Sequence, residues 1–574
     1  MKRLKTIIFI AIAALGLGSC KKALVETPYD FINPGQLGTT EADAKLYVNG
    51  ALNAINGGNM FQYGAFPKVL ELDHDDITGP DWGMGDFGAG NFTAFWGINT
   101  MWSGPYTLIK RSNFGIYKIT PMGFDEKAKN NALGQLNFLK AWGYFLLVRA
   151  YGDVPLYKIA LEEGAAPQMP RAPIKEVYEY IIETLKLAES QLYSVKDGKY
   201  EIGRISKGAA STLLAKVYLQ MASGALPGAQ ITVMTGPALR TVGTSKVRVA
   251  MPVPMTFTKN VVAGYEGFDA KAYFKLARDK AMEVITSGDY DLYPTYMDTW
   301  KLANRNKLEH IWSLQALSGD EELGNTISKE YLGVLKTAMQ NISLDAPQTL
   351  SGRWYGVRDH WYELFEPEDQ RITDGILHRW QDANGFYRFF PGKFSDIVKG
   401  VDVSPTALAI KARYGFQSSD SYVANSFHIG MLRKFAGVTD PTIDRQDFAF
   451  PFLRYADVLL MFAEADNEYN NGPTTDAYTY LNKVRLRSNA SEAKNLNLES
   501  FRSMVIEERR RELASEGNRR WDLIRWGIYL QVMNAVDIDE NNVLKRRQER
   551  HLLYPIPLDE LSANKLITGN NKGW

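Results

Sequence analysis

The sequence lacks the cysteine pairs, the long apolar runs beyond its N-terminus and the excess of one charge that would indicate disulfide cross-links, a membrane-spanning helix or a polyanionic partner. It contains one cysteine, Cys20, so the chain forms no internal disulfide and has to be stabilised by burial of a core. Beyond the N-terminus, no run reaches the roughly 18 apolar residues that a membrane-spanning helix needs. Lys and Arg number 66 against 65 Asp and Glu, which argues against a global field that would attract nucleic acid.

Motifs of common catalytic sites are also missing. The 574 residues contain no H-E-x-x-H, G-x-S-x-G or P-loop pattern. Ser491–Lys494 fits S-x-x-K, but its S-D-N and K-T-G companions are absent. Gly83–Gly88 fits G-x-G-x-x-G without a predicted strand before it or a helix after it, so a loop is the better interpretation. We predict no catalytic residue, although a glycosidase pair among the 65 acids stays open as an alternative.

The N-terminus reads as a targeting segment. Basic residues within 2–5 precede an apolar stretch, 6–18, that is too short to span a membrane as a mature helix. The stretch ends in Leu-Gly-Ser-Cys at 17–20, which resembles a bacterial lipobox. We therefore expect residues 1–19 to be a cleaved signal peptide, Cys20 to carry acyl chains, and residues 20–40 to form a tether.

Helical periodicity dominates the mature chain. Apolar and small residues recur at helical spacing in many segments, and these fall into pairs that resemble tetratricopeptide repeats. The period of about 34 residues is broken by insertions, so we predict a degenerate repeat scaffold, with an unrelated helical bundle as the alternative. The predicted helices span 40–55, 102–117, 133–151, 174–192, 209–221, 271–287, 454–469 and 475–487.

Two segments differ from this pattern. Residues 223–268 are rich in Gly, Thr, Val and Pro and poor in charge, and residues 388–450 are similarly irregular. Such composition favours short strands and loops over helix. We predict that these segments gather into a loop-rich lobe with short β elements, carried by the mainly α scaffold.

The most distinctive stretch lies near the C-terminus, at 501–527. Acids alternate with arginines along a predicted helix, a glycine interrupts it, and a short apolar helix follows. The interleaved acids favour an ion-paired helix packed on the scaffold over a nucleic-acid surface. The sequence of residues 506–527, IEERRRELASEGNRRWDLIRWG, resembles the C-terminal signature of the SusD/RagB family of nutrient-binding lipoproteins. RYADVLLMFAEA at 454–465 and the closing Ile-Pro at 556–557 are similar to the same family.

This resemblance implies a SusD-like fold and a non-enzymatic role. The expected division is a helical region at 41–222 with a binding loop at 57–100, loop-rich insertions at 223–450, and a C-terminal helical region at 451–574. The implied protein is lipid-anchored at the outer membrane, faces the cell exterior, and passes captured oligosaccharide to a SusC-like, TonB-dependent transporter. A lipid-anchored glycoside hydrolase and a peptide-binding or structural interaction protein of the same fold remain alternatives.

The expected ligand site is the glycine-rich, aromatic segment 57–100. Glycine loops bury few rings locally, so Trp82 and Trp96 are predicted to lie at a surface, where they would stack on a sugar. Packing in the core or against a partner protein is the alternative for these rings. The side chains of Asp73, Asp75 and Asn91 would bind the hydroxyl groups of the sugar.

In the SusD/RagB family a central loop also contributes ligand contacts. The resemblance places the counterparts here at Tyr296, Trp300 and Trp354. No cofactor is predicted. Asp73, Asp75 and Asp76 with His74 do not match an EF-hand, which leaves a looser calcium site or a capping acid cluster open.

Overall fold

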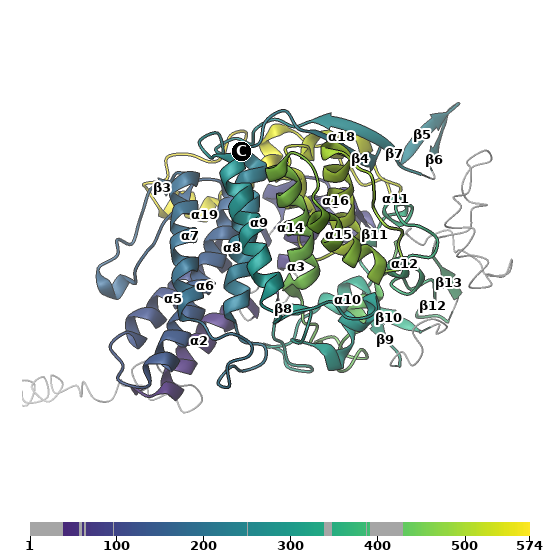
Figure 1. The fold of residues 1–574 in the computed structure, drawn as a ribbon. Coiled ribbons are helices and arrows are strands. Elements are labelled where there is room, and N and C mark those ends of the chain that lie inside the picture. The colour runs from purple at the N-terminus through teal and green to yellow at the C-terminus, as the bar shows by residue number, and fades with distance from the viewer. Residues whose placement is uncertain are drawn as a thin grey trace, which may run out of the picture.

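The computed structural model describes residues 38–56, 60–61, 65–95, 97–249, 251–337, 347–385, 387–390 and 429–574. Long helices stand side by side in one row, and the shorter elements and loops gather beyond the end of the row and over it (Figure 1). Cys20 and Trp96 lie outside the described residues, as does the side chain of Trp82.

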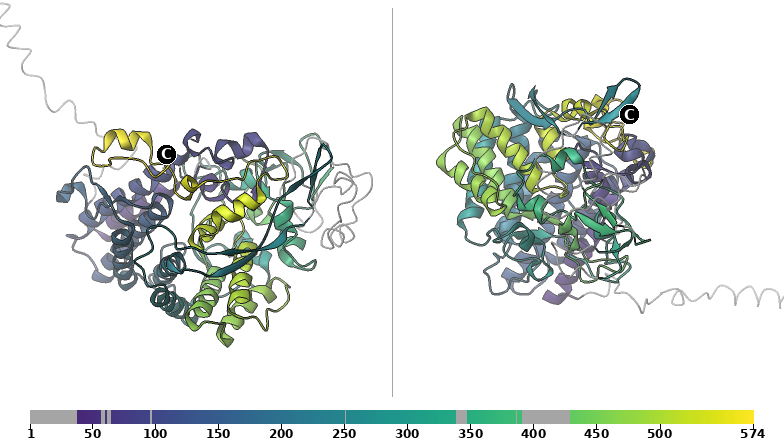
Figure 2. Two further views of the ribbon diagram at one scale, coloured as in Figure 1. Left: turned by 90° about the horizontal axis from the view of Figure 1, so that it is seen from above. Right: turned by 90° about the vertical axis from the view of Figure 1, so that its right-hand side faces the viewer.

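The row of helices follows the order of the chain. Each helix packs on the next, α2 on α5, α5 on α6, α6 on α7, α7 on α8, α8 on α9 and α9 on α14, and α14 then packs on both α15 and α16. Figure 2 shows several of these helices end-on in the view from above. Their bounds are α2 Glu41–Asn56, α5 Gly97–Ile119, α6 Glu126–Tyr151, α7 Ile174–Gln191, α8 Lys207–Ala225, α9 Ala270–Thr286, α14 Tyr455–Asn470, α15 Thr475–Arg487 and α16 Leu498–Glu512.

Local sequence accounts for these helices. Side chains at their N-caps accept backbone N–H groups, as Asp125 does from Ala128 at 3.1 Å and Ser206 from Ala209 at 3.2 Å. Gly143 lets α6 approach α5, because a Cβ there would lie 3.0 Å from Ile109. The predicted mainly α fold of tetratricopeptide-like helical pairs is confirmed.

Short antiparallel strands form separate two-stranded units. The hairpin β4–β7 lies over the top of the row, and β5–β6 extends beyond it (Figure 1). Among the described residues the predicted β structure in 223–268 is therefore present. The strand pairs are β1 Ile77–Thr78 with β11 Gly356–Val357, β2 Val154–Pro155 with β3 Arg171–Ala172, β4 Gln230–Thr235 with β7 Val253–Thr258, β5 Leu239–Val242 with β6 Ser245–Arg248, β8 His310–Ser313 with β14 Pro451–Arg454, β9 Val334–Leu335 with β10 Thr349–Ser351, and β12 Arg379–Gln381 with β13 Tyr387–Phe389.

The segment 57–100 is more helical than expected. It contains α3 (Ala65–Glu71) and α4 (Asp81–Gly88), so the prediction of an irregular loop across the G-x-G-x-x-G motif is wrong. Glycine-rich sequence has low helix propensity, but here a kink at Gly85, with φ of +56°, lets two short turns join. The remaining short helices are α10 Ile327–Tyr331, α11 Asp359–Tyr362, α12 Gln370–Thr373, α17 Arg519–Arg525, α18 Tyr529–Val536 and α19 Leu558–Ala563.

The expectations for residues 388–450 and for the division of the chain into regions are not settled by the structure. Most of 388–450 lies outside the described residues, and the proposed division into three regions stays a prediction. Within the part of the chain that the structure describes, no helix has both the length and the apolarity to cross a membrane.

Candidate functional site

The arginines of the C-terminal signature form a buried charge layer, not a surface patch. From α16, Arg509 donates to Asp457 at 2.6 Å and to Asp522 at 2.9 Å. From α17, Arg525 pairs with the buried Glu464 of α14. These contacts tie the last helices to the middle of the row, and they confirm the predicted ion-paired helix.

The charge layer extends to the acids that follow α3. Asp73 accepts hydrogen bonds from Arg520 and Arg547, each at 2.8 Å, and from the hydroxyl of Tyr529 at 2.7 Å. Its exposed fraction is 0%. Burial opposes ionisation of Asp73, but the charges of Arg547 and Arg520 outweigh it and hold the pKa of this carboxyl below its usual value.

Asp75 lies in the same layer. Its carboxylate accepts from Arg519 at 2.9 Å and 2.8 Å and lies 3.0 Å from Arg510. Burial opposes ionisation here as well, and the charges of Arg519 and Arg510 lower the pKa of Asp75. Since Asp73 and Asp75 present no oxygen at the surface, we leave both out of the proposed ligand site.

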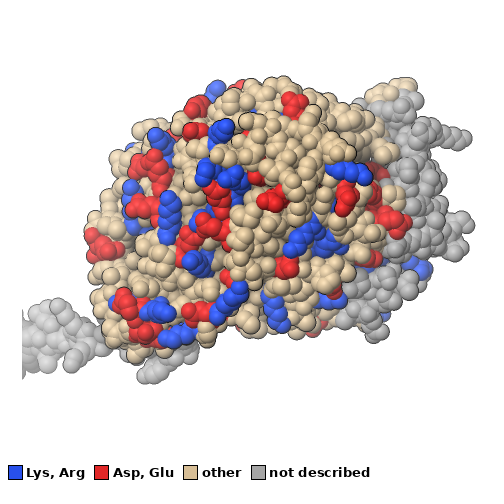
Figure 3. All heavy atoms as spheres, in the orientation of Figure 1, with Lys and Arg blue, Asp and Glu red and all other residues tan. Residues whose placement is uncertain are grey.

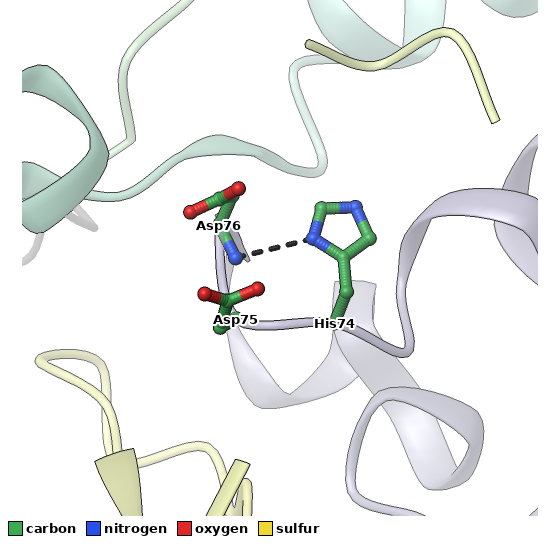
Figure 4. Close-up of side chains that lie close together, drawn as sticks. All are labelled: His74, Asp75 and Asp76. Atoms are coloured by element: carbon green, nitrogen blue, oxygen red, sulfur yellow. Dashed lines mark hydrogen bonds between the residues drawn. The ribbon is translucent and has the colours of Figure 1, made fainter. Parts of the chain in front are cut away.

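The possible cation cluster belongs to this layer too. Ligand atoms of His74, Asp75 and Asp76 lie within 4.8 Å of one another (Figure 4). However, His74 Nδ1 accepts the backbone N–H of Asp76 at 3.1 Å, and Arg510 donates to Asp76 at 2.6 Å. Guanidinium groups already neutralise both carboxylates, and a calcium ion among them would be repelled. The residues present do not fit a calcium site.

Two of the central aromatic residues pack inside the protein. Tyr296 and Trp300 are the first and last residues of the 3-10 helix η4 (Tyr296–Trp300), and their exposed fractions are 3% and 6%. Trp300 lies beneath Lys434, whose Nζ is 4.9 Å from the ring centroid, and beneath Arg454 at 5.3 Å. Both rings therefore pack in the core, which was the alternative to ligand contact. We leave Tyr296 and Trp300 out of the proposed ligand site as well.

Trp354 is placed differently. Its ring is half-buried, and the ammonium groups of Lys68 and Lys329 lie 5.2 Å and 5.9 Å from the ring centroid. Backbone contacts fix its position: the N–H of Trp354 donates to the carbonyl of Glu330 in α10 at 2.8 Å. We call Trp354 with Lys68 and Lys329 the Trp354 surface.

The structure joins this surface to the segment 57–100. Strand β1 pairs with β11 in the register Ile77 with Val357 and Thr78 with Gly356. A Cβ on Gly79 would lie 2.4 Å from the carbonyl oxygen of Trp354, so the two backbones are in close contact just before α4 begins. The predicted N-terminal and central segments thus meet at Trp354. Asn91 is exposed but follows the far end of α4, where it donates to Asp86 at 3.2 Å.

A buried acid lies directly behind the Trp354 surface. Glu330 accepts the hydroxyl of Tyr355 and, at 2.7 Å, the hydroxyl of Thr326. Burial raises the pKa of Glu330 to about 7, although the charges of Lys68 and Lys329 oppose the rise. Sequence reasoning missed Lys68, Lys329 and Glu330, because nothing in their local pattern distinguishes them from other charged residues.

The outer charge pattern is mixed. On the face shown in Figure 3, Lys and Arg side chains alternate with Asp and Glu and form no large area of one sign. This agrees with the near balance of 66 basic and 65 acidic residues. Neither feature is typical of a surface that binds a polyanion.

Comparisons with known proteins place the chain in a family. Residues 358–574 match the family model described as the SusD family, and residues 93–219 match one described as starch-binding and associating with the outer membrane. A SusD-like protein, P25, from Formosa agariphila is 25% identical to this chain, and the match covers 98% of each.

Solved structures agree on the fold. A SusD homolog from Bacteroides thetaiotaomicron superposes with a TM-score of 0.68 at 22% identity, over 94% of this chain and 98% of that one. Surface glycan-binding protein A from Bacteroides uniformis gives a TM-score of 0.66 at 17% identity, over 93% and 99%. With its C-terminal signature, its helical row and these matches together, the chain belongs to the SusD/RagB family.

Proposed function

We propose that this protein is a lipid-anchored glycan-binding protein of the outer membrane. It captures oligosaccharide at the Trp354 surface and delivers it to a TonB-dependent transporter, without catalysing a reaction. Support comes from the family description as starch-binding and outer-membrane-associated, and from the relative in Bacteroides uniformis that is named for glycan binding. The lipobox-like segment ending at Cys20 supports the anchor.

The pairing of β1 with β11 is the observation that carries the choice of surface. It fixes a half-buried tryptophan beside the start of α4, where the segment with Trp82 begins. A tryptophan face stacks well on the C–H face of a sugar ring. The ammonium groups of Lys68 and Lys329 lie over the Trp354 ring and can donate to hydroxyl groups of the sugar, with one donor of Lys329 already bound to Asp444.

A glycoside hydrolase would need two carboxyl groups on either side of a sugar bond. At the Trp354 surface, Asp444 is paired with Lys329 at 2.6 Å, and the other nearby acid, Glu330, is 1% exposed and is engaged by Tyr355 and Thr326. A group in this position supports the Trp354 loop from behind and does not face a ligand. This placement favours binding over hydrolysis.

The test is a calorimetric titration of residues 21–574 with a panel of oligosaccharides, with product analysis by chromatography. We expect saturable binding of one glycan class, no product, and a loss of about tenfold or more in affinity on Trp354→Ala. Tyr117→Ala, at the far end of α5, is the matched control and should bind normally. Unchanged binding by Trp354→Ala would reject the assigned surface, and product formation would reject the non-enzymatic role.

Anchoring is tested separately by Cys20→Ala in the full chain. Loss of the only thiol removes the acylation site, so the protein should leave the membrane fraction while its glycan affinity stays unchanged. Retention of the Cys20→Ala protein in the membrane fraction would contradict anchoring through this residue.

A further inference from the structure

A cavity is lined by segments of the chain that do not include the residues of the Trp354 surface. It has a volume of about 410 Å³, within the roughly 300–1,000 Å³ typical of small-molecule sites. Its wall comes from the middle of α5, the loop after β2, and α19 near the C-terminus. Because these segments meet only in the folded chain, the cavity is a product of the tertiary structure.

Aromatic rings line this cavity. Trp102 and Tyr106 from α5 pack with ring centroids 5.1 Å apart, and Tyr106 meets Tyr157 edge-on at 5.9 Å. The hydroxyl of Tyr106 donates to the carbonyl of Pro155 at 2.9 Å, which fixes the ring. The mouth is apolar: Ile159 and Leu161 line it with exposed fractions of 46% and 50%.

Polar groups are placed among the rings. Glu560 of α19 accepts the indole N–H of Trp102 at 3.3 Å and keeps further acceptor capacity on the cavity wall. Lys110 on the outer side of α5 adds donors, whereas the hydroxyl of Thr107 already donates to the carbonyl of Ser103 and keeps only acceptor capacity. A wall that combines rings, a carboxylate and hydrogen-bond donors is typical of a site for a polar molecule with apolar faces.

Asn113 fixes the loop after β2 against α5. It lines the cavity and is 3% exposed. Its Nδ2 donates to the carbonyls of Tyr157 and Ile159, at 3.0 Å and 3.2 Å, which assigns the orientation of the amide. The Oδ1 then has no hydrogen-bond donor among the residues that the structure describes. This oxygen has no surface that a water molecule could reach, so Asn113 supports the cavity wall and offers no acceptor to a ligand.

We infer that this cavity is a second saccharide-binding site, separate from the Trp354 surface, that holds a short saccharide unit. Sugar C–H groups contact Tyr106 and Tyr157, and hydroxyl groups donate to Glu560 and accept from Lys110. The assignment rests on the proposed glycan-binding function and adds a location to it. Two sites on one molecule would let it hold separate parts of a branched or long glycan at once.

The test isolates the second site in a Trp354→Ala background. The probes are maltose, cellobiose, laminaribiose and chitobiose, titrated by calorimetry beside the oligosaccharide panel. Thr107→Trp fills the cavity from its outer wall without removing Asn113 or Glu560. Thr120→Trp is the matched control: it lies just past α5, is exposed, and makes the same bond to the carbonyl four residues earlier, at 2.7 Å against 2.8 Å for Thr107.

We expect the Trp354→Ala protein to keep saturable binding of at least one probe. Adding Thr107→Trp should weaken that binding about tenfold or more, and adding Thr120→Trp should not. If Trp354→Ala abolishes all binding that the unmodified protein shows, the second site is rejected and the proposed function stands. If the binding that remains in Trp354→Ala is not weakened by Thr107→Trp, the second site is also rejected. An unmodified protein that binds no saccharide in either set rejects both proposals.

Discussion

At the scale of single residues, Asp73 shows what the C-terminal signature does. Its carboxylate pairs with both Arg520 and Arg547, which come from segments more than 400 positions away in the chain. Replacing it by Asn leaves two buried guanidinium groups without their counter-charge. We expect Asp73→Asn to lower the free energy of unfolding by about 3–5 kcal/mol.

Urea unfolding followed by circular dichroism measures this change. Asp559→Asn, on the exposed first turn of α19, is the matched control and should stay within about 0.5 kcal/mol of the unmodified protein. A loss of stability no larger than the control's would mean that the buried pairs contribute little.

Glu330 gives a prediction for pH. Burial raises the folded-state pKa of Glu330 to about 7, above the 4.5 of a free glutamate, so its favourable contribution to stability is complete below about pH 4.5 and is lost as pH rises through 7. The shift corresponds to about 3 kcal/mol. Glu330→Gln cannot ionise, so its stability relative to the unmodified protein should increase between about pH 5 and about pH 8. Thermal unfolding across this range measures the difference, and parallel profiles for the two proteins would refute the assignment.

Ligand contacts of single residues are the feature that the sequence predicts least well. It identified Asp73, Asp75, Tyr296 and Trp300 as candidate ligand contacts, but burial depends on partners that are distant in the chain. The acids near residue 75 and the arginines near residue 520 are each visible in the sequence, yet nothing local says that they pair. Composition identified the aromatic segment, and only the fold shows that Trp354 lies beside it.

At the scale of elements, periodicity predicted the long helices well. The segment 133–151 lies within α6, and 475–487 coincides with α15, because apolar spacing is a local property. The short helix α4 was missed because glycine-rich sequence carries little periodicity, and α3 was missed because its seven residues, with an internal proline, are too few to show a period. The pairing of β1 with β11 joins residues about 280 positions apart, and two-residue strands leave no pattern to detect.

The junction of β1 and β11 makes a prediction of its own. Gly79→Ala would place a Cβ 2.4 Å from the carbonyl oxygen of Trp354, so the two segments must move apart. We expect lower stability by about 1–3 kcal/mol and weaker glycan binding. Gly50→Ala, in α2 with no atom within 4 Å of the added Cβ, should leave binding unchanged and stabilise the helix slightly. Calorimetric titration and thermal unfolding measure both effects, and normal binding by Gly79→Ala would show that the junction does not position the site.

At the scale of the whole molecule, the row of helices acts as a rigid support. The buried charge layer ties α16 and α17 to α14 and to the segment after α3, so the C-terminal signature helps to hold in place the segment that leads into β1. The arginine–acid pairs stabilise the helical scaffold, whereas the proposed ligand contact Trp354 lies in a loop between short strands. This division explains why the family was recognisable from the signature and the ligand residues were not.

Hydrogen–deuterium exchange of residues 21–574, with and without the bound oligosaccharide, tests the central claim most directly. If glycan binds where β1 and β11 join two distant segments, peptides covering 65–88 and 349–357 should both gain protection at the same ligand concentration. Protection confined to other parts of the chain, such as α14 to α16, or to only one of these two segments, would contradict the account.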